Sequence, residues 1–490
     1  MTFPIRISLI FIAGCVSLYW MFGHTFLRYS QTAEDQPMVI AHWGDHIDYQ
    51  MWSEIFEAFR QKHPDIRVER RHLPSTRYHQ KIQQQIVSDT APDLFMIQDE
   101  PFPHLMASGK LADLSPYLKA KNRWGENGEV VKGQYWGTAV REFGKYDLES
   151  GEWKQWGMPV WGGCNLLFYN KANWNRARIQ VSNSPNMPGL EKSDDGWWYV
   201  NDNKWTLDEF IEVCIRLTMD LDGDGRTDQY ALQPTGAVNW LPFHWALGAS
   251  WLDEETFTKT TFYGPECEAS LTLLRDMRLK FKVMPEASDF GALNLNTAFF
   301  TGMVSILNTG TYGLIYLNAS GIDYDILHFP RGEGGRRFTR FFWEGMAMSR
   351  GSQHKKEAWQ FLDFLTSLAG QKILANYQVS LPSLMESEPY FMNAERAPKT
   401  GQNVDIYKFT EAARTYARRQ PINVHYGLMQ RAVAKSMAAL VSEDENSRLT
   451  PRQAIARYLF ETPELLEKIP PVDPVAAVER YRSVWKAMSE

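Results

Sequence analysis

The stretch DLDGDGRTDQYAL, residues 220–232, carries the side chains in this chain that are best suited to holding a metal ion. Calcium takes about six to eight oxygen ligands, and a calcium-binding loop supplies them from alternate positions around a sharp glycine turn. Gly225 stands at the turn position, and the backbone carbonyl of Arg226 stands at the seventh. The carboxylates at the alternate positions are Asp220, Asp222, Asp224 and Asp228. The last position, which is a bidentate glutamate in calcium sensors, is Ala231, so Gln229 or water would have to replace it.

The elements on either side of this loop exclude a calcium sensor. A helix is predicted over 207–219, because Thr206 and Glu209 form a capping-box pattern at its start. The chain leaves the loop through QYALQ (229–233), which has the pattern of a strand. Sensors change the angle between two helices, and a helix–loop–strand junction has only one. A structural calcium site and a solvated acidic turn both remain open.

An α/β lobe is predicted near the start of the chain. An apolar run at 38–43 has the length of a strand, and residues 49–62 place Trp52, Ile55, Phe56 and Phe59 on one helix face. A strand at 65–73, a helix at 77–88 and a fully apolar strand at 93–98 follow. This alternation indicates a doubly wound sheet, whose ligands lie beyond the carboxyl ends of the strands. Residues 43–45 and 98–100 occupy those ends.

A second α/β region is predicted after residues 166–174. The stretch 343–384 reads as a strand, one long helix and an extended exit. The stretch 179–203 reads as an irregular surface loop, and the chain beyond 405 reads as helical. The predicted buried face of the long helix consists of Ala358, Trp359, Phe361, Leu362, Phe364 and Leu365.

Length and composition limit the classes of protein that this chain can represent. Its 490 residues predict two or more compact units. The net charge is −6 and no basic run is present, so a nucleic-acid partner is not expected. Cys164, Cys214 and Cys267 have neither disulfide nor metal spacing, and we expect them to be buried thiols.

The N-terminus carries an export signal or a membrane anchor. Residues 7–22 are uncharged and follow Arg6, so residues 1–30 are set apart from the folded chain. The segment IAGC (12–15) resembles a lipobox, in which Cys15 would be lipidated. The apolar run continues past Cys15 toward the roughly 20 residues that span a bilayer, which favours an uncleaved anchor. Either alternative places the folded part outside the cytoplasm, attached to the membrane.

Sequence patterns for catalysis are missing. No GxSxG, HExxH, GxxxxGK[ST] or GxGxxG segment stands in a usable context, so we expect a binding protein and no enzyme. Most of the eighteen tryptophans are expected in the core, but an aromatic ring can also cover the flat apolar face of a sugar while carboxylates and amides bind its hydroxyls.

Six segments in one order resemble the family 1 extracellular solute-binding proteins, the sugar receptors of ABC importers that include maltose-binding protein. These segments are APDLFMIQ, GKLADLSPYL, WGMPVWGGCNLLFYNKANW, DLDGDGRTDQYAL, TAFFTGMVSILNTGTYGL and EGMAMSRGSQHKKEAWQFLDFLTSLAGQKIL. They span roughly residues 36–385, and the stretches 120–157 and 179–203 look like additions to the family pattern.

The resemblance implies an α/β, two-lobed periplasmic-binding-protein type II fold with a hinge and a ligand cleft between the lobes. One lobe would comprise residues 36–163 plus 343–382, and the other would comprise 164–342 plus 383–490. The implied function is capture of a mono- or oligosaccharide by a monomer and its delivery to ABC permease subunits. A membrane-tethered ligand-sensing module is the runner-up, and a secreted carbohydrate-active enzyme is the third alternative. The resemblance also implies a structural calcium in the acidic turn of some members.

Candidate ligand-binding residues lie at strand ends and turns near the implied hinge. Aromatic side chains would cover sugar faces, and polar side chains would bind hydroxyls. The candidates are Trp43, Asp45, Gln98, Trp161, Trp240, Asn308, Tyr312 and Trp343, with Trp245 and Trp251 as further aromatic candidates.

Overall fold

The computed structural model describes residues 36–120, 135–147, 152–233, 236–253, 257, 259–290, 294–397 and 404–462. The strands are β1 (Met38–Trp43), β2 (Val68–Leu73), β3 (Leu94–Gln98), β4 (Gly144–Asp147), β5 (Glu152–Gln155), β6 (Gly157–Asn170), β7 (Ile179–Val181), β8 (Leu190–Lys192), β9 (Trp198–Val200), β10 (Tyr230–Leu232), β11 (Val304–Gly310), β12 (Tyr324–Leu327), β13 (Thr339–Met348), β14 (Leu381–Pro382) and β15 (Ala417–Arg419). The longer helices are α2 (His46–Lys62), α3 (Ser75–Val87), α8 (Leu207–Leu217), α9 (Ala237–Ala246), α10 (Pro265–Arg275), α13 (Gly313–Ser320), α14 (Lys355–Leu365), α15 (Leu368–Tyr377), α17 (Tyr407–Thr415), α18 (Tyr426–Leu440) and α19 (Pro451–Glu461).

One sheet runs through the molecule in the order β10-β11-β6-β13-β3-β1-β2. β1 is parallel to both β2 and β3, which is the arrangement expected of a doubly wound lobe. The long strand β6 changes partner along its length: Gly157–Cys164 pair with β13, whereas Asn165–Tyr169 pair with β11. β6 therefore crosses from one half of the sheet to the other.

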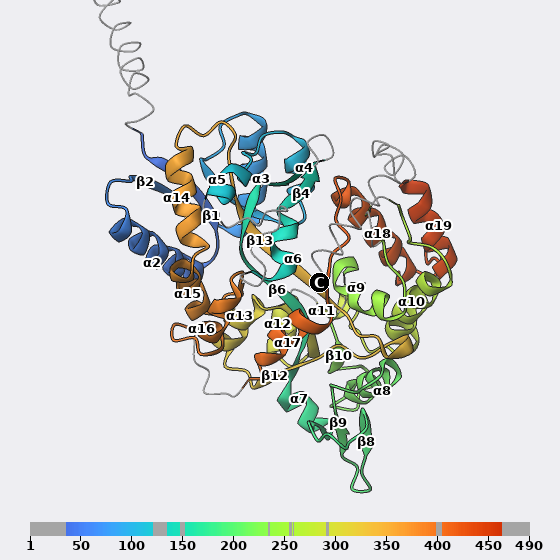
Figure 1. Ribbon diagram of the computed structural model, residues 1–490. Coiled ribbons are helices and arrows are strands. Elements are labelled where there is room, and N and C mark those ends of the chain that lie inside the picture. Colours follow the sequence, from blue (N-terminus) through green and yellow to red (C-terminus); the bar gives the residue numbers. More distant parts are fainter. Residues whose placement is uncertain are drawn as a thin grey trace, which may run out of the picture.

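Lobe 1 is the part built on β1, β2 and β3. Trp52, Ile55 and Phe59 of α2 are buried, as the helical spacing in the sequence predicts. The ring of Phe361 in α14 lies 5.0 Å from that of Phe59, so a segment far along the chain completes this lobe. α14 contacts α2 and β13, and Figure 1 shows it in the same part of the molecule as α2.

Lobe 2 is the part built on β10, β11 and β12, with α8, α13 and α17 around it (Figure 1). Helices α18 and α19 pack on α9 and α10. A buried ion pair joins α17 to the segment after β9, because Lys408 Nζ lies 2.5 Å from Asp202 Oδ2. The same ammonium donates to the carbonyl of Ile326 in β12 at 2.8 Å.

Most of the predicted elements are confirmed, and three predictions are wrong. The chain beyond 405, predicted as helical, includes the short strand β15, which pairs with β13. The predicted long helix is divided into α14 and α15, because Ser367 between them has an extended backbone (φ −80°, ψ 167°). The predicted irregular loop over 179–203 instead forms a small sheet in the order β7-β9-β8. All six predicted apolar residues of α14 are buried. Cys164, Cys214 and Cys267 are free and buried.

The predicted anchor or signal in residues 1–30 lies outside the described residues, as does the chain beyond 462. Within the described ranges, no helix combines the length and apolar character needed to cross a membrane.

Candidate functional site

A cavity of about 300 Å³ lies where the parallel strands of lobe 1 end. Residues that follow β1, β2 and β3 contribute to its wall, as do alternate residues of β13 and one turn of α13 from lobe 2. This is the position at which doubly wound sheets bind their ligands. The lining residues are Trp43, Gly44, Asp45, Asp48, Ser75, Gln98, Asp99, Glu100, Trp161, Tyr312, Ile315, Tyr316, Arg340, Phe342, Glu344, Val379 and Ser380.

Strand register places three of these side chains in one row across the sheet. Glu344 of β13 lies opposite Gln98 of β3 on one side and opposite Trp161 of β6 on the other. Directly opposed residues project from the same face of a sheet. The indole N–H of Trp161 donates to Glu344 Oε2, and Gln98 Nε2 donates to Glu344 Oε1 at 3.4 Å. Gln98 and Glu344 give this row polar groups that face the cavity, and Trp161 gives it an aromatic ring.

The N-terminus of α2 brings two carboxylates to the wall. Asp45 is the N-cap residue, and its Oδ1 accepts from the backbone N–H groups of Ile47 and Asp48 at 2.8 and 3.2 Å. Asp48 completes a capping box, because its Oδ2 accepts from the Asp45 backbone N–H at 2.8 Å. The box fixes both side chains at the edge of the cavity.

The opposing wall comes from lobe 2. Tyr312, Ile315 and Tyr316 follow helical spacing at the start of α13 and lie on one face of it. Ile315 is buried, whereas Tyr312 and Tyr316 are 42% and 47% exposed. Two phenol rings that keep this much exposure beside a cavity can cover an apolar ligand face.

Electrostatics set these carboxyls apart from surface carboxyls. Burial raises the pKa of Glu344 from 4.5 to about 7, although hydrogen bonds from Trp161 and Gln98 and the charge of Arg340 oppose the rise. Burial, together with the charges of Asp45 and Glu344, raises the pKa of Asp48 to about 7. Burial also raises the pKa of Asp99 well above its usual range, with added repulsion from Glu142 and Glu100.

Five of the eight residues predicted from sequence line this cavity: Trp43, Asp45, Gln98, Trp161 and Tyr312. The other three do not. Trp343 is 1% exposed and points to the opposite face of β13 from Glu344, since neighbouring residues of a strand alternate. Its ring packs over Gly162, where an added Cβ would lie 2.3 Å from the indole.

Trp240 and Asn308 are buried inside lobe 2. Trp240 donates its indole N–H to Ser270 Oγ at 2.9 Å and stacks on Phe243. Asn308 donates to the Asn239 carbonyl at 2.8 Å and accepts from Asn165 at 3.0 Å, so both ends of its amide are bonded within the protein. The two further tryptophans, Trp245 and Trp251, are each 2% exposed and also lie outside the lining.

Sequence reasoning missed three lining residues that strand periodicity places together on one face of β13. Arg340, Phe342 and Glu344 alternate with the buried Phe341 and Trp343 along β13. In a strand, successive side chains point to opposite faces, so the sequence TRFFWEGMAM places Arg340, Phe342 and Glu344 on one face and Phe341 and Trp343 on the other.

The acidic turn forms a loop whose carboxylates face one another. Oxygen atoms of Asp220, Asp222 and Asp224 all lie within 4.8 Å of one another. Backbone N–H groups of Gly223 and Gly225 donate to Asp220 at 2.7 and 2.8 Å, and these bonds lower the pKa of Asp220.

Two side chains that were expected to bind calcium, those of Gln229 and Asp228, form hydrogen bonds within the protein instead. The Gln229 side chain is buried, donates to the Leu217 carbonyl at 2.8 Å and accepts from Arg176, so it cannot replace the missing glutamate. Asp228 lies outside the three-carboxylate group, and its Oδ2 accepts from the Leu221 N–H at 2.6 Å. Arg226 donates its backbone N–H to Asp224 at 2.8 Å. This bond does not use the Arg226 carbonyl, which is the group expected to bind calcium.

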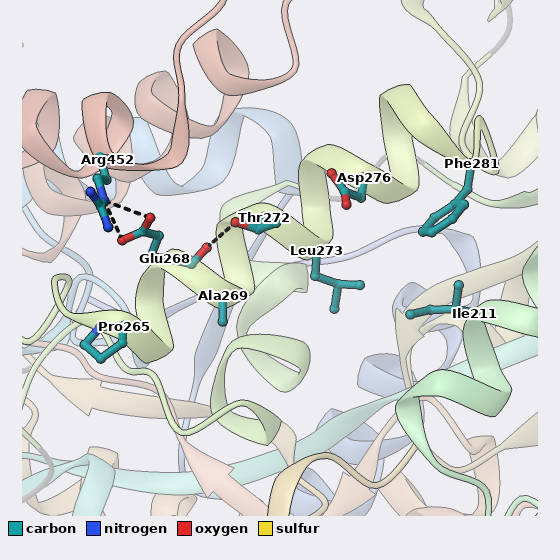
Figure 2. A pocket seen from close by; sticks show the side chains of 9 residues that line it. All are labelled: Ile211, Pro265, Glu268, Ala269, Thr272, Leu273, Asp276, Phe281 and Arg452. Carbon is teal, nitrogen blue, oxygen red and sulfur yellow. Dashed lines mark hydrogen bonds and ion pairs between the residues drawn. The ribbon is translucent and has the colours of Figure 1, made fainter.

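A second hollow, of about 520 Å³, lies on α10 between α8 and α19. Figure 2 shows Arg452 paired with Glu268 at one end and Phe281 near Ile211 at the other. Its polar side chains are few and do not converge on a common point, unlike those of the strand-end cavity.

The fold and the cavity define a class, the two-lobed α/β binding proteins that hold a ligand between their lobes. The sequence profile of the bacterial extracellular solute-binding proteins matches residues 43–372. The chain belongs to this family, whose members are binding proteins. A comparison with curated proteins finds no match.

Solved structures with the same fold include three sugar complexes. The Listeria monocytogenes ABC substrate-binding protein Lmo0181, with cycloalternan, has a TM-score of 0.69 and 20% identity, over 88% of this chain and 98% of its own. A Thermotoga lettingae ABC solute-binding protein, with α-D-tagatose, has a TM-score of 0.66 and 18% identity, over 88% and 100%. The maltose/maltodextrin-binding domain MalE of Bdellovibrio bacteriovorus, with maltotriose, has a TM-score of 0.66 and 16% identity, over 88% and 100%.

Proposed function

We propose that this protein is the substrate-binding component of an ABC importer and captures a carbohydrate outside the cytoplasmic membrane. The observation that carries the proposal is the strand-end cavity, in which the Gln98–Glu344–Trp161 row of the sheet faces Tyr312 and Tyr316 of lobe 2. Hydroxyl-binding groups on one wall and aromatic rings on both suit a sugar. Cycloalternan, tagatose and maltotriose in three structures of the same fold support carbohydrate as the ligand class.

Ligand capture would proceed by closure of the lobes. The ligand binds first to the larger wall on lobe 1, and α13 of lobe 2 then adds its two tyrosines. Closure is stabilised only by contacts that the open form lacks, and Tyr312 and Tyr316 supply such contacts. The closed form would dock on permease subunits, which perform the transport, and the binding protein would act as a monomer.

Membrane attachment and calcium complete the proposal. Residues 7–22 support attachment through an uncleaved anchor or a lipidated Cys15. The convergence of Asp220, Asp222 and Asp224 supports a structural calcium ion at the acidic turn. Bound there, the ion would neutralise mutual repulsion among exposed carboxylates and fix the junction between α8 and β10.

The experiment that tests the function combines a ligand screen with a pair of variants. Melting temperatures are measured over a panel of sugars and oligosaccharides, because a ligand that binds only the native state stabilises it, by about 2.7 kcal/mol at 100 times Kd. Tyr316→Ala should weaken the tightest ligand, whereas Tyr263→Ala, which removes a tyrosine that is 55% exposed outside the cavity, should not. Equal effects of the two variants, or no stabilising sugar, would contradict the proposal.

A further inference from the structure

Arg340 is the one cationic side chain in the lining of the strand-end cavity. Its Nε is buried without a hydrogen-bond partner, and among the described residues its guanidinium forms no ion pair. A guanidinium carries five N–H donors and stays charged at any physiological pH. Because buried donors are nearly always paired, an unpaired guanidinium that faces a cavity points to a partner that the protein itself does not supply.

The carboxyls at this end of the cavity take their hydrogen bonds from other donors. Arg340 acts on Asp99 and Glu344 through its charge, which opposes the rise in the pKa of both. Asp99 nevertheless accepts from a backbone N–H of β13 at 3.3 Å, and Glu344 accepts from the two other side chains of its row. Glu100 accepts from the Gln420 amide at 3.4 Å. Each of these carboxyls therefore has a donor, whereas Arg340 has no acceptor in the part of the chain that the structure describes.

The neighbours of Arg340 on β13 hold its side chain at the cavity. It shares one face of the strand with Phe342 and Glu344, which also line the cavity. Its Cζ lies 5.4 Å from the centre of the Phe342 ring, and this cation–π contact restricts the guanidinium. A side chain that is already ordered loses less conformational entropy when a ligand binds to it.

The shape of the guanidinium limits the groups that can pair with it. Its N–H donors form a planar fork, so its strongest partners present two oxygen atoms side by side. Neighbouring hydroxyls on a sugar ring do this, and so does the carboxylate of an acidic sugar. The Trp161 indole and the Gln98 amide already donate to Glu344, whereas the donors of Arg340 remain available to a ligand.

Resting on the proposed function, we propose that Arg340 is the specificity-determining residue of this site and that its guanidinium binds two adjacent oxygen atoms of the carbohydrate. A sugar that lacks either oxygen would leave an N–H group of Arg340 unpaired in a cavity from which closure excludes water. Sites built to hydrogen-bond a ligand oxygen reject analogues without that oxygen for the same reason. The ligand is thereby selected by the arrangement of one pair of neighbouring oxygens.

The test begins with titration calorimetry on glucose, galactose, maltotriose, cellotriose, glucuronate and galacturonate, and the tightest binder among them is the probe. Arg340→Gln should weaken the probe at least tenfold. It should leave the melting temperature of the ligand-free protein unchanged or higher, because it removes no hydrogen bond to a described residue. Arg340→Lys should weaken the probe at least fivefold, since an ammonium lacks the planar fork. Arg60→Gln, at a side chain of α2 that is 70% exposed, is the matched control and should change neither quantity.

Deoxy analogues of the probe identify the atoms that Arg340 binds. Removal of single hydroxyls from a neutral probe should weaken binding to the wild type at least tenfold at two neighbouring carbons, and these losses should shrink to less than threefold in Arg340→Gln. If the probe is a uronate, its advantage over the matching neutral sugar should disappear in this variant instead. Unchanged affinity in Arg340→Gln, or deoxy losses that persist in it, would overturn the inference and leave the proposed function intact. If no sugar of the series binds, the proposed function fails together with the inference.

Discussion

Replacing Glu344 with glutamine should make the protein more stable at neutral pH and leave its stability unchanged in acid. The folded protein holds this carboxyl with a pKa of about 7 against an ordinary value of 4.5, and burial is the main cause. The folded state therefore binds the proton more tightly than the unfolded state does. The stability that this group contributes is fully present below pH 4.5 and is lost as the pH rises through about 7.

The magnitude follows from the two pKa values. Each pH unit between them is worth about 1.4 kcal/mol, which gives a loss of about 3 kcal/mol between pH 4 and pH 8. Glutamine is uncharged across this range, and its amide oxygen can still accept the hydrogen bond from the Trp161 indole. Glu344→Gln should therefore match the wild type near pH 4 and exceed it in free energy of unfolding by up to about 3 kcal/mol at pH 8.

The assay is denaturant unfolding of ligand-free wild type and variant at intervals of half a pH unit. Because the charge of Glu344 also raises the pKa of Asp48, the difference between the two proteins contains the burial of Glu344 and its repulsion with Asp48 together, and both act in the same direction. Glu445→Gln is the control, since that side chain is 86% exposed and pays no burial cost for its charge. A wild-type-to-variant difference that stays constant from pH 4 to pH 8 would refute the reasoning.

Three further predictions concern other parts of the chain. Trp343→Ala should lower the free energy of unfolding by about 3–5 kcal/mol and leave the ligand affinity of the folded protein unchanged, because its ring is buried over Gly162. Trp161→Ala should instead weaken ligand binding by about 1–3 kcal/mol. Titration calorimetry measures the affinity and denaturant unfolding measures the stability, so the two variants can be told apart. Calcium should raise the melting temperature relative to chelator, and Asp222→Ala with Asp224→Ala should abolish the difference; equal melting temperatures in all four conditions would leave only a solvated turn. Cys15→Ser should leave the mass of the membrane-bound protein unchanged if the N-terminus is an anchor, whereas loss of a lipid mass would show that the lipobox is used.

The elements of lobe 1 could be predicted because their signals are local. The apolar run MVIAHW corresponds to β1 without error, and the helical spacing of Trp52, Ile55 and Phe59 identifies the buried face of α2. Residues at the ends of β1 and β3 reach the cavity for the same reason, since topology alone places those ends together.

What could not be predicted depends on pairing between distant strands. Glu344 is a site residue because β13 lies between β3 and β6 in one particular register, and a shift of one residue would have exposed Trp343 in its place. Trp240 and Asn308 were predicted from residue type and nearby turns, but their polar atoms are used by partners elsewhere in lobe 2. The break between α14 and α15 lies at Ser367, whose extended backbone the apolar periodicity of the segment does not reveal.

The central claim is that a sugar binds where the strands of lobe 1 end and that lobe 2 closes over it. A crystal structure of the chain from Gln36 onward, grown with the tightest carbohydrate from the screen, tests this claim most directly. The account predicts ligand density between the Gln98–Glu344–Trp161 row and the α13 tyrosines, with Asp45 in contact. Density for the sugar in the hollow on α10, or elsewhere with the strand-end cavity filled only by water, would contradict it.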